Sequence, residues 1–253
     1  MKLIAIDIGN SSINIGFFTE AGLFTQKIGT RPLISSSEYA AFFNEFIKEK
    51  NIDKTFEGVI ISSVVPGHTD VIKEACKTLS RKEPLILSHK LKTGINFQVK
   101  ETERLGTDRI AASVGACDLF GAPVAVVDFG TATTLNFIGS GNVYKGGAII
   151  PGIRLMKSAL FKGTARLPDI SVSMPLSPLG KDTTESILSG IIYGTAGAVE
   201  RIITEVERME GESFKVVVTG GYAELVAPFV RKINYIEPAL VLKGLKIIYE
   251  RNA

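Results

Sequence analysis

An aspartate near the start of the chain lies inside an apolar run and is followed at once by a polar turn. The segment IAIDIGNSSINIG, residues 4–16, places Asp7 among isoleucines and just before Gly9. A buried carboxylate without a partner costs several kcal/mol or takes up a proton. The glycine turn lets backbone N–H groups approach an anion, and a cation between them would relieve the repulsion by Asp7. The pattern therefore predicts a phosphate with Mg²⁺, held by Asp7 directly or through water. The alternative is an aspartate that only caps its own turn.

The same pattern returns in the second half of the chain. The segment VAVVDFGTATTLNFI, residues 124–138, again has an apolar strand, an aspartate (Asp128), one apolar residue, a glycine and small hydroxyl residues. Asp7 and Asp128 are 121 positions apart, so the repeat predicts two domains of like construction. Clefts between domains are preferred ligand sites. Two facing turns would hold the β- and γ-phosphates of a nucleotide between them.

Two further stretches carry polar groups suited to a small substrate or a nucleotide. In Gly106-Thr107-Asp108-Arg109, Asp108 falls in the first turn of a predicted helix, where the helix dipole stabilises its charge and keeps it a proton acceptor. Arg109 offers a rigid fork for a carboxylate. The alternative is a helix-start aspartate beside a surface arginine. Thr219-Gly220-Gly221 follows a strand and predicts either a platform for a flat base or an ordinary strand-to-helix turn.

Composition narrows the class of protein. The 253 residues are 45% apolar and 22% charged with a net charge of +3, which is typical of a globular chain of two ordinary domains. No Lys/Arg run suggests a nucleic-acid partner, and no segment approaches the roughly 20 apolar residues of a membrane span. Cys76 and Cys117 are the only cysteines, so we expect no disulfide framework and a reducing cytoplasm. Two histidines leave little for a zinc site or histidine-based catalysis. Neither a P-loop nor a dinucleotide fingerprint occurs.

Hydrophobic periodicity and turn residues predict an alternation of strands and helices. Strands are expected over 2–8, 13–17, 58–65, 85–87, 124–138 (as a hairpin), 146–150 and 216–218. Helices are expected over 37–50, 71–79, from about 107 to 120, 154–161 and 184–209, with two more helical pieces after the last strand.

Six motifs occur in an order that resembles the type III pantothenate kinases, and they span nearly the whole chain. They are DIGNSS at 7–12, GTDR at 106–109, VDFGTATT at 127–134, GGAIIPGI at 146–153, GKDT at 180–183 and TGG at 219–221. The resemblance implies an α/β fold of the acetate and sugar kinase/Hsc70/actin type. Two ribonuclease-H-like domains, residues 1–117 and 118–253, would flank a nucleotide cleft. The implied reaction is ATP-dependent phosphorylation of the primary hydroxyl of pantothenate, the first step of coenzyme A synthesis.

The resemblance also implies roles for residues. Asp108 is implied as the proton acceptor, and Asp128 as the ligand of a monovalent cation, K⁺ or NH₄⁺. The implied ATP-binding residues are Asp7, Ile8, Gly9, Asn10, Ser11, Ser12, Ile13, Asn14 and Thr131, with Mg²⁺ near Asp7. The implied pantothenate-binding residues are Gly106, Thr107, Asp108, Arg109, Val99 and Thr183. Thr183 would reach the site from the other subunit of a cytoplasmic homodimer whose active site lies near the subunit interface.

The chain departs from the family pattern at four positions. Thr107 stands where alanine is usual, Asp182 where asparagine is usual, and Asn136 where aspartate is common. Val99 aligns with a common tyrosine, which puts one pantothenate contact in doubt, and Phe97 is the nearby aromatic residue that would replace it. Asp7, Asp108, Arg109 and Asp128 are all retained, so we expect an active enzyme.

Three other functions fit parts of the sequence. A different kinase or phosphatase of the same superfamily would act on a sugar or small acid and would not consume ATP in proportion to added pantothenate. A regulatory or transcription-accessory protein would bind a partner without turnover, but the acidic set and the lack of a basic patch disfavour it. An ATPase of the chaperone or actin type needs additional subdomains, for which 253 residues leave little room.

Overall fold

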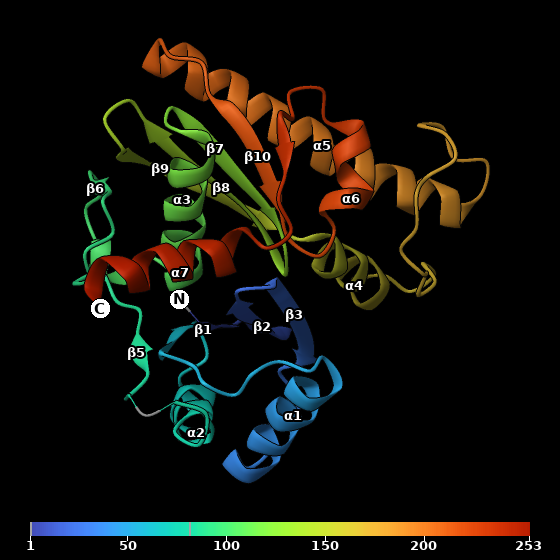
Figure 1. Cartoon of the computed structure of the whole chain (residues 1–253). Coiled ribbons are helices and arrows are strands. Elements are labelled where there is room, and N and C mark those ends of the chain that lie inside the picture. The colour runs from blue at the N-terminus through green and yellow to red at the C-terminus, as the bar shows by residue number, and fades with distance from the viewer. Residues whose placement is uncertain (1, 81) are drawn as a thin grey trace. The chain divides into compact units, whose positions relative to one another are not determined.

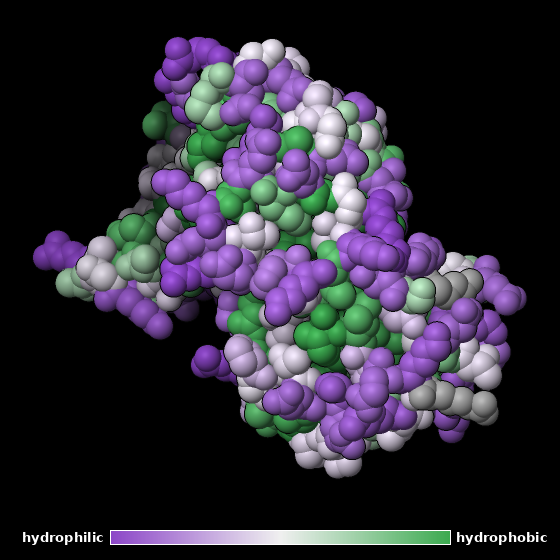
Figure 2. All heavy atoms as spheres, turned by 90° about the vertical axis from the view of Figure 1, so that its left-hand side faces the viewer, coloured by the Kyte–Doolittle hydropathy of each residue, from purple (hydrophilic) through white to green (hydrophobic). Residues whose placement is uncertain are grey.

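The computed structural model describes residues 2–80 and 82–253 and contains two compact units (Figure 1). The first unit runs to Gly94 and also takes in Lys100–Asp118 and Leu240–Ala253. The second unit consists of Ile95–Val99 and Leu119–Ala239. None of the helices in these described ranges is long and apolar enough to cross a bilayer. In the view of Figure 2, hydrophilic residues are spread over the visible face and not gathered in one region.

The first unit is built on a five-stranded mixed sheet with the order β3-β2-β1-β4-β5. β1 runs antiparallel to β2 and parallel to β4, and β2 runs antiparallel to β3. The strands are β1 (Leu3–Ile8), β2 (Ser12–Thr19), β3 (Gly22–Gly29), β4 (Gly58–Ser63) and β5 (Leu85–Ile86). The helices are α1 (Ser36–Glu49), α2 (Pro66–Cys76), the short η1 (Thr102–Arg104), α3 (Thr107–Phe120) and α7 (Leu240–Asn252).

The second unit repeats this arrangement in a six-stranded sheet with the order β11-β10-β7-β8-β9-β6. β7 pairs antiparallel with β8 and parallel with β10, as β1 does with β2 and β4. The strands are β6 (Asn96–Phe97), β7 (Val124–Phe129), β8 (Ala132–Gly139), β9 (Val143–Pro151), β10 (Lys215–Thr219) and β11 (Tyr235–Ile236). The helices are α4 (Ile153–Gly163), α5 (Thr183–Glu210), α6 (Ala223–Val226) and the short η2 (Ala227–Phe229). The prediction of two domains of like construction is confirmed.

In each unit, one layer of helices covers the face of the sheet opposite to the face that carries the side chain of Asp7 or Asp128. In the first unit, the even-numbered residues of β1 are buried with apolar side chains of α1 and α2. In the second, the odd-numbered residues of β7 are buried with apolar side chains of α5 and α6. Asp7 and Asp128 have the other parity on their strands, so their side chains leave the opposite face of each sheet.

The last helix packs with the first unit, although the expected boundary assigned residues 118–253 to the second. α7 packs against β1 and β4, and its backbone approaches α3 closely where Gly244 meets Ala111. A Cβ on Gly58 would lie 1.9 Å from the Tyr249 hydroxyl, so this contact needs a glycine. Hydrophobic periodicity identifies such a helix but does not say which of two similar sheets it covers.

Local signals explain most element boundaries and one error. Ser35 and Glu38 form a reciprocal capping box that starts α1. α3 begins at Thr107, as predicted. The prediction for α2 was wrong at its start, because the helix begins at Pro66 and not near residue 71. Proline suits the first helical position, since it has no N–H to leave unpaired there.

Candidate active site

The first aspartate turn joins β1 to β2, and the neighbouring strand supplies a partner for its carboxylate. Asp7 is buried and lies opposite Asn14 on β2 and Ser62 on β4, so the three side chains share one face of the sheet. The Gly9 N–H donates to the Ser12 carbonyl at 3.0 Å, which closes the turn. Asn10 at the tip is exposed. The turn therefore presents polar groups at the carboxyl ends of two parallel strands, where α/β sheets bind ligands.

A chain of hydroxyl groups links this carboxylate to the start of α3. The Ser62 Oγ donates to Asp7 Oδ1 at 2.9 Å and lies 3.0 Å from Thr107 Oγ1. Thr107 Oγ1 also accepts from the Ser63 N–H at 3.1 Å. Thr107 Oγ1 in turn donates to the Ser63 carbonyl at 3.2 Å, so both backbone groups of Ser63 hold the Thr107 hydroxyl. Thr107 was predicted to bind substrate, and in the structure its hydroxyl is engaged with β4.

Asp108 and Arg109 follow directly in the first turn of α3. Asp108 is partly buried, and its Oδ1 accepts from the Arg109 N–H at 2.9 Å. Burial raises the pKa of Asp108, and the Arg109 hydrogen bond and charge oppose the shift only in part. The sequence predicts that the helix dipole favours the anion, whereas in the structure desolvation by burial is the largest influence and raises the pKa of Asp108. A carboxylate with a raised pKa is a better proton acceptor than an ordinary aspartate.

The second aspartate turn, between β7 and β8, is enclosed by two glycines from distant motifs. A Cβ on Gly220, whose φ is +93°, would lie 2.3 Å from Asp128 Oδ1 and 2.7 Å from the Phe129 backbone. A Cβ on Gly152 would lie 2.3 Å from the Thr131 carbonyl oxygen. Both positions therefore need glycine for close backbone approach. These contacts bring three of the six motifs together around the Asp128 carboxylate.

The two turns are similar but not identical. Asp128 pairs with Thr134 and Thr219 as Asp7 pairs with Asn14 and Ser62. In the first hairpin, four residues lie between Ile8 and Ile13, the last pair of residues in the strand register. In the second hairpin, only three residues lie between the corresponding pair, Phe129 and Thr133. The ungapped alignment of the two motifs therefore holds up to the glycine and shifts by one residue after it.

Other predicted site residues lie on different elements of the second unit. Thr183 is exposed and opens α5, with Asp182 as its N-cap accepting from the Glu185 N–H at 2.8 Å. Aspartate serves this cap as well as the asparagine usual in the family. Val99 is partly buried two residues after Phe97, whose ring lies 5.6 Å from that of Tyr144.

Some predicted ATP contacts are restricted to the backbone, and two polar partners were not predicted. Ile8 and Ile13 have no exposed surface and belong to the core of the first unit, so their side chains are closed to a ligand. Ser62, which donates to Asp7, and Thr219, which lies opposite Asp128 in the strand register, were missed as such. Both could have been predicted from the sequence. Each lies at the C-terminal end of a buried strand, and the βαβ pattern makes that strand parallel to the strand that carries Asp7 or Asp128.

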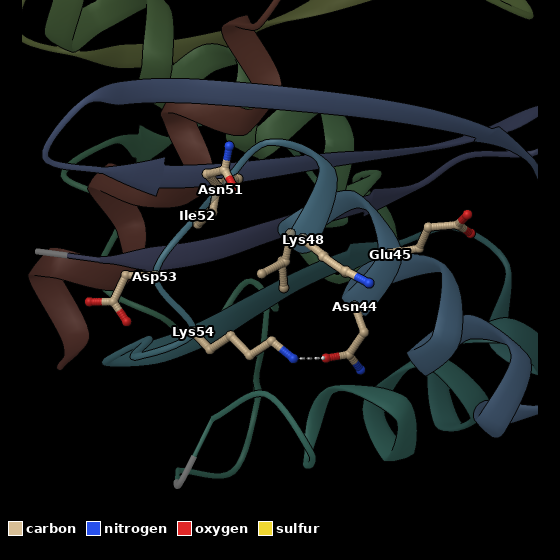
Figure 3. A pocket seen from close by; sticks show the side chains of 8 residues that line it. Asn44, Glu45, Lys48, Asn51, Ile52, Asp53 and Lys54 are labelled. Carbon is tan, nitrogen blue, oxygen red and sulfur yellow. Dashed lines mark hydrogen bonds between the residues drawn. The ribbon is translucent and has the colours of Figure 1, made fainter.

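A separate hollow in the first unit lies beside the end of α1 and contains none of the predicted site residues (Figure 3). Its volume is about 650 Å³. Two interactions involve its polar side chains: Lys54 Nζ donates to Asn44 Oδ1 at 3.1 Å, and Asp53 pairs with Lys2, outside the hollow, at 2.6 Å. The hydrogen bond from Lys2 holds the pKa of Asp53 at about 2. These neutralised groups do not form a catalytic set.

The repeated sheet order and the paired aspartate turns define a two-domain protein of the acetate and sugar kinase/Hsc70/actin type. Solved structures with this fold support the class. One is component A of the (R)-2-hydroxyglutaryl-CoA dehydratase of Acidaminococcus fermentans, with a TM-score of 0.57 at 11% identity over 99% of each chain. Another is the activator of the 2-hydroxyisocaproyl-CoA dehydratase from Clostridium difficile with bound ADPNP, with a TM-score of 0.55 at 10% identity over 99% of this chain and 96% of that one. At such identities these structures inform the fold alone.

Sequence comparison identifies the family. The model of the type III pantothenate kinase family matches residues 3–205. A type III pantothenate kinase from Moorella thermoacetica is 38% identical over 252 residues, which are 99% of this chain and 99% of that one. The chain therefore belongs to the type III pantothenate kinase family, as the six motifs predicted.

Proposed function

We propose that the chain transfers the γ-phosphate of ATP to the primary hydroxyl of pantothenate, giving 4'-phosphopantothenate in the first step of coenzyme A synthesis, with Asp108 as the proton acceptor. Family membership supports the reaction. The observation that carries the assignment of residues is the hydroxyl chain from Asp7 through Ser62 to Thr107. It fixes the carboxylate of the phosphate turn relative to the α3 turn that carries Asp108.

The residues of the two turns suit a nucleotide with its cations. Carboxylate, hydroxyl and backbone oxygens are the ligands that Mg²⁺ prefers. Asp7 on β1 would hold Mg²⁺, directly or through water, beside the N–H groups of residues 9–12. Asp128 would hold K⁺ or NH₄⁺ beside the turn that contains Thr131. The two cations would offset the charge of the triphosphate.

Substrate positioning falls to the first turn of α3. Arg109 would bind the pantothenate carboxylate through its fork, and the backbone of Gly106 and Thr107 would line the same site. This orientation would bring the primary hydroxyl within hydrogen-bond reach of Asp108, the distance at which general bases act. An aliphatic alcohol is a weak acid, so Asp108 would take the proton late, as the phosphoryl group moves. Positioning and charge neutralisation dominate phosphoryl transfer.

The surface around Thr183 supports a homodimer. Thr183 lines a hollow of about 930 Å³ between α4 and α5, together with Met156, Leu160 and Ile187. The loop before α5 exposes large apolar side chains at Met174, Leu176 and Leu179. Large apolar side chains gathered on an exposed loop are typical of an interface. We place the second subunit here, with its own Thr183 completing the neighbouring pantothenate site. A cytoplasmic location fits the two free cysteines.

The test is ADP release in a mixture of the protein, ATP, Mg²⁺, K⁺ and pantothenate, with pantothenate omitted as the control. The proposal predicts one ADP for each pantothenate added. Release that ignores pantothenate, or that follows an added sugar instead, would favour another kinase of the superfamily. Tight binding of ATP with no release under any condition would favour the regulatory alternative.

A further inference from the structure

Two buried polar residues outside the predicted site, Thr30 and His68, are hydrogen-bonded to the first aspartate turn. Thr30 follows β3 and is 2% exposed, and His68 lies in the first turn of α2 and is 7% exposed. Thr30 Oγ1 donates to the Gly9 carbonyl at 2.6 Å, and its N–H donates to the Ser11 carbonyl at 3.3 Å. His68 Nε2 lies 2.6 Å from the Thr30 carbonyl. Since a carbonyl only accepts, Nε2 carries the hydrogen.

These hydrogen bonds fix the direction of a peptide group at the tip of the turn. In a planar trans peptide the C=O and N–H bonds point in opposite directions. The Gly9 carbonyl and the Asn10 N–H belong to the same peptide group. Because Thr30 holds that carbonyl on one side, the Asn10 N–H must point away from Thr30, toward the exposed tip. His68 in turn anchors the backbone of Thr30, because its Nε2 donates to the Thr30 carbonyl from α2.

We propose that Thr30 and His68 are positioning residues for nucleotide binding, which hold the Asn10 N–H in the direction that a phosphate oxygen requires. The proposal rests on the proposed phosphate-binding role of the turn at residues 9–12. Without the Thr30 hydroxyl, the Gly9 carbonyl loses this hydrogen bond and the peptide between residues 9 and 10 rotates more easily, because a turn peptide that includes glycine has little steric restriction. The fraction of molecules competent to bind phosphate then falls, and the apparent affinity falls by the same fraction.

Matched variants separate this role from ordinary packing. Thr30→Val keeps the shape and removes the hydroxyl, whereas Thr30→Ser keeps the hydroxyl. Thr195→Val is the control for loss of a buried threonine hydroxyl, because Thr195 Oγ1 also donates to a carbonyl at 2.6 Å, within α5. His68→Phe and His68→Gln form a second pair that removes or keeps a donor near Nε2.

Affinity for ADP with Mg²⁺ is measured by calorimetry, together with the KM for pantothenate and the unfolding midpoint. We expect Thr30→Val to weaken ADP binding about tenfold, as when the competent turn falls to a tenth of the population. Thr30→Ser and Thr195→Val stay within about twofold of the wild type, and the KM for pantothenate does not change. His68→Phe, which removes the donor, is expected to weaken ADP binding more than His68→Gln, which keeps one. This comparison tests the proposal if Thr30→Val does not fold.

Three results would overturn the proposal. They are ADP affinity unchanged in Thr30→Val, a loss in Thr30→Ser equal to that in Thr30→Val, and equal losses for ADP and pantothenate with a lowered unfolding midpoint. Failure of the underlying role of the turn gives a different result: Asp7→Asn would then bind ADP with Mg²⁺ as tightly as the wild type.

Discussion

Replacement of Asp108 by asparagine removes the proposed proton acceptor with little other change. Asparagine has nearly the same shape, and its Oδ1 can still accept the Arg109 N–H that Asp108 accepts at 2.9 Å. Burial raises the pKa of Asp108, so the folded protein holds that proton to higher pH than the unfolded chain does. Stability therefore falls as pH rises through the interval between the two pKa values. A neutral asparagine avoids this penalty, and the variant should be at least as stable as the wild type at neutral pH.

The expected loss lies in kcat. General-base assistance is worth on the order of 10²–10⁴-fold, or about 3–5 kcal/mol of transition-state stabilisation. The assay is ADP release at saturating ATP and pantothenate, with nucleotide affinity measured separately. The wild type should lose kcat/KM as pH falls through the raised pKa, at a pH above the ordinary 3.8, because a protonated carboxyl cannot accept the proton. That acid limb should be absent in Asp108→Asn.

Asp118→Asn is the matched control, because Asp118 lies on the same helix, is exposed and pairs with Arg251 at 3.2 Å. An exposed ion pair contributes little to stability, so the kcat of Asp118→Asn should stay within about twofold of the wild type. Wild-type turnover in Asp108→Asn would refute the role of Asp108. An equal loss in both variants would show that charge at α3, and not proton acceptance, sets the rate.

Other predictions follow from contacts at the two turns. Ser62→Ala removes the donor to Asp7, and since hydrogen bonds to charged groups are worth roughly 1.5–3 kcal/mol, the KM for ATP with Mg²⁺ should rise tenfold or more in steady-state kinetics. An unchanged KM would show that Asp7 needs no support from β4. Gly220→Ala should lower the free energy of unfolding by about 2–4 kcal/mol in urea titration, because the added Cβ meets Asp128 and the Phe129 backbone at a positive φ. Gly197→Ala, in the exposed interior of α5 with open space around it, should instead raise that free energy by about 0.5–1 kcal/mol. Asp128→Asn should abolish the dependence of activity on KCl while the protein stays folded by circular dichroism, and retained K⁺ activation would place the cation elsewhere.

Local sequence signals predicted most of the fold. The apolar run before Asp7 and its repeat before Asp128 gave both hairpins, and the Thr107 start of α3 was found from its polar first turn. β3 was missed because its few apolar residues, Leu23, Phe24 and Ile28, do not alternate with polar ones along the strand. The short strands β6 and β11 have two residues each, too few for periodicity to register.

The site was predictable where motif residues act through their own chain segment, and not where they act through tertiary contacts. Asp7 and Asp128 stand out because each is a charged residue at the end of an apolar strand, whereas Asp108 was singled out from its place in the first turn of a predicted helix and from the family resemblance. The buried Thr30 has no such signal, since its hydrogen bonds to the turn depend on the return of β3 along β2. The engagement of the Thr107 hydroxyl with Ser62 likewise depends on where β4 ends relative to α3. Such partners emerge only when strands far apart in the sequence are paired.

A crystal structure of the protein with a non-hydrolysable ATP analogue, Mg²⁺, K⁺ and pantothenate tests the central claim most directly. The proposal predicts the primary hydroxyl of pantothenate at about 2.6–3.2 Å from the Asp108 carboxylate, with the pantothenate carboxylate on Arg109 and the triphosphate against both aspartate turns. A bound pantothenate whose hydroxyl lies away from Asp108, or a triphosphate that contacts neither Asp7 nor Asp128 through a cation, would contradict it.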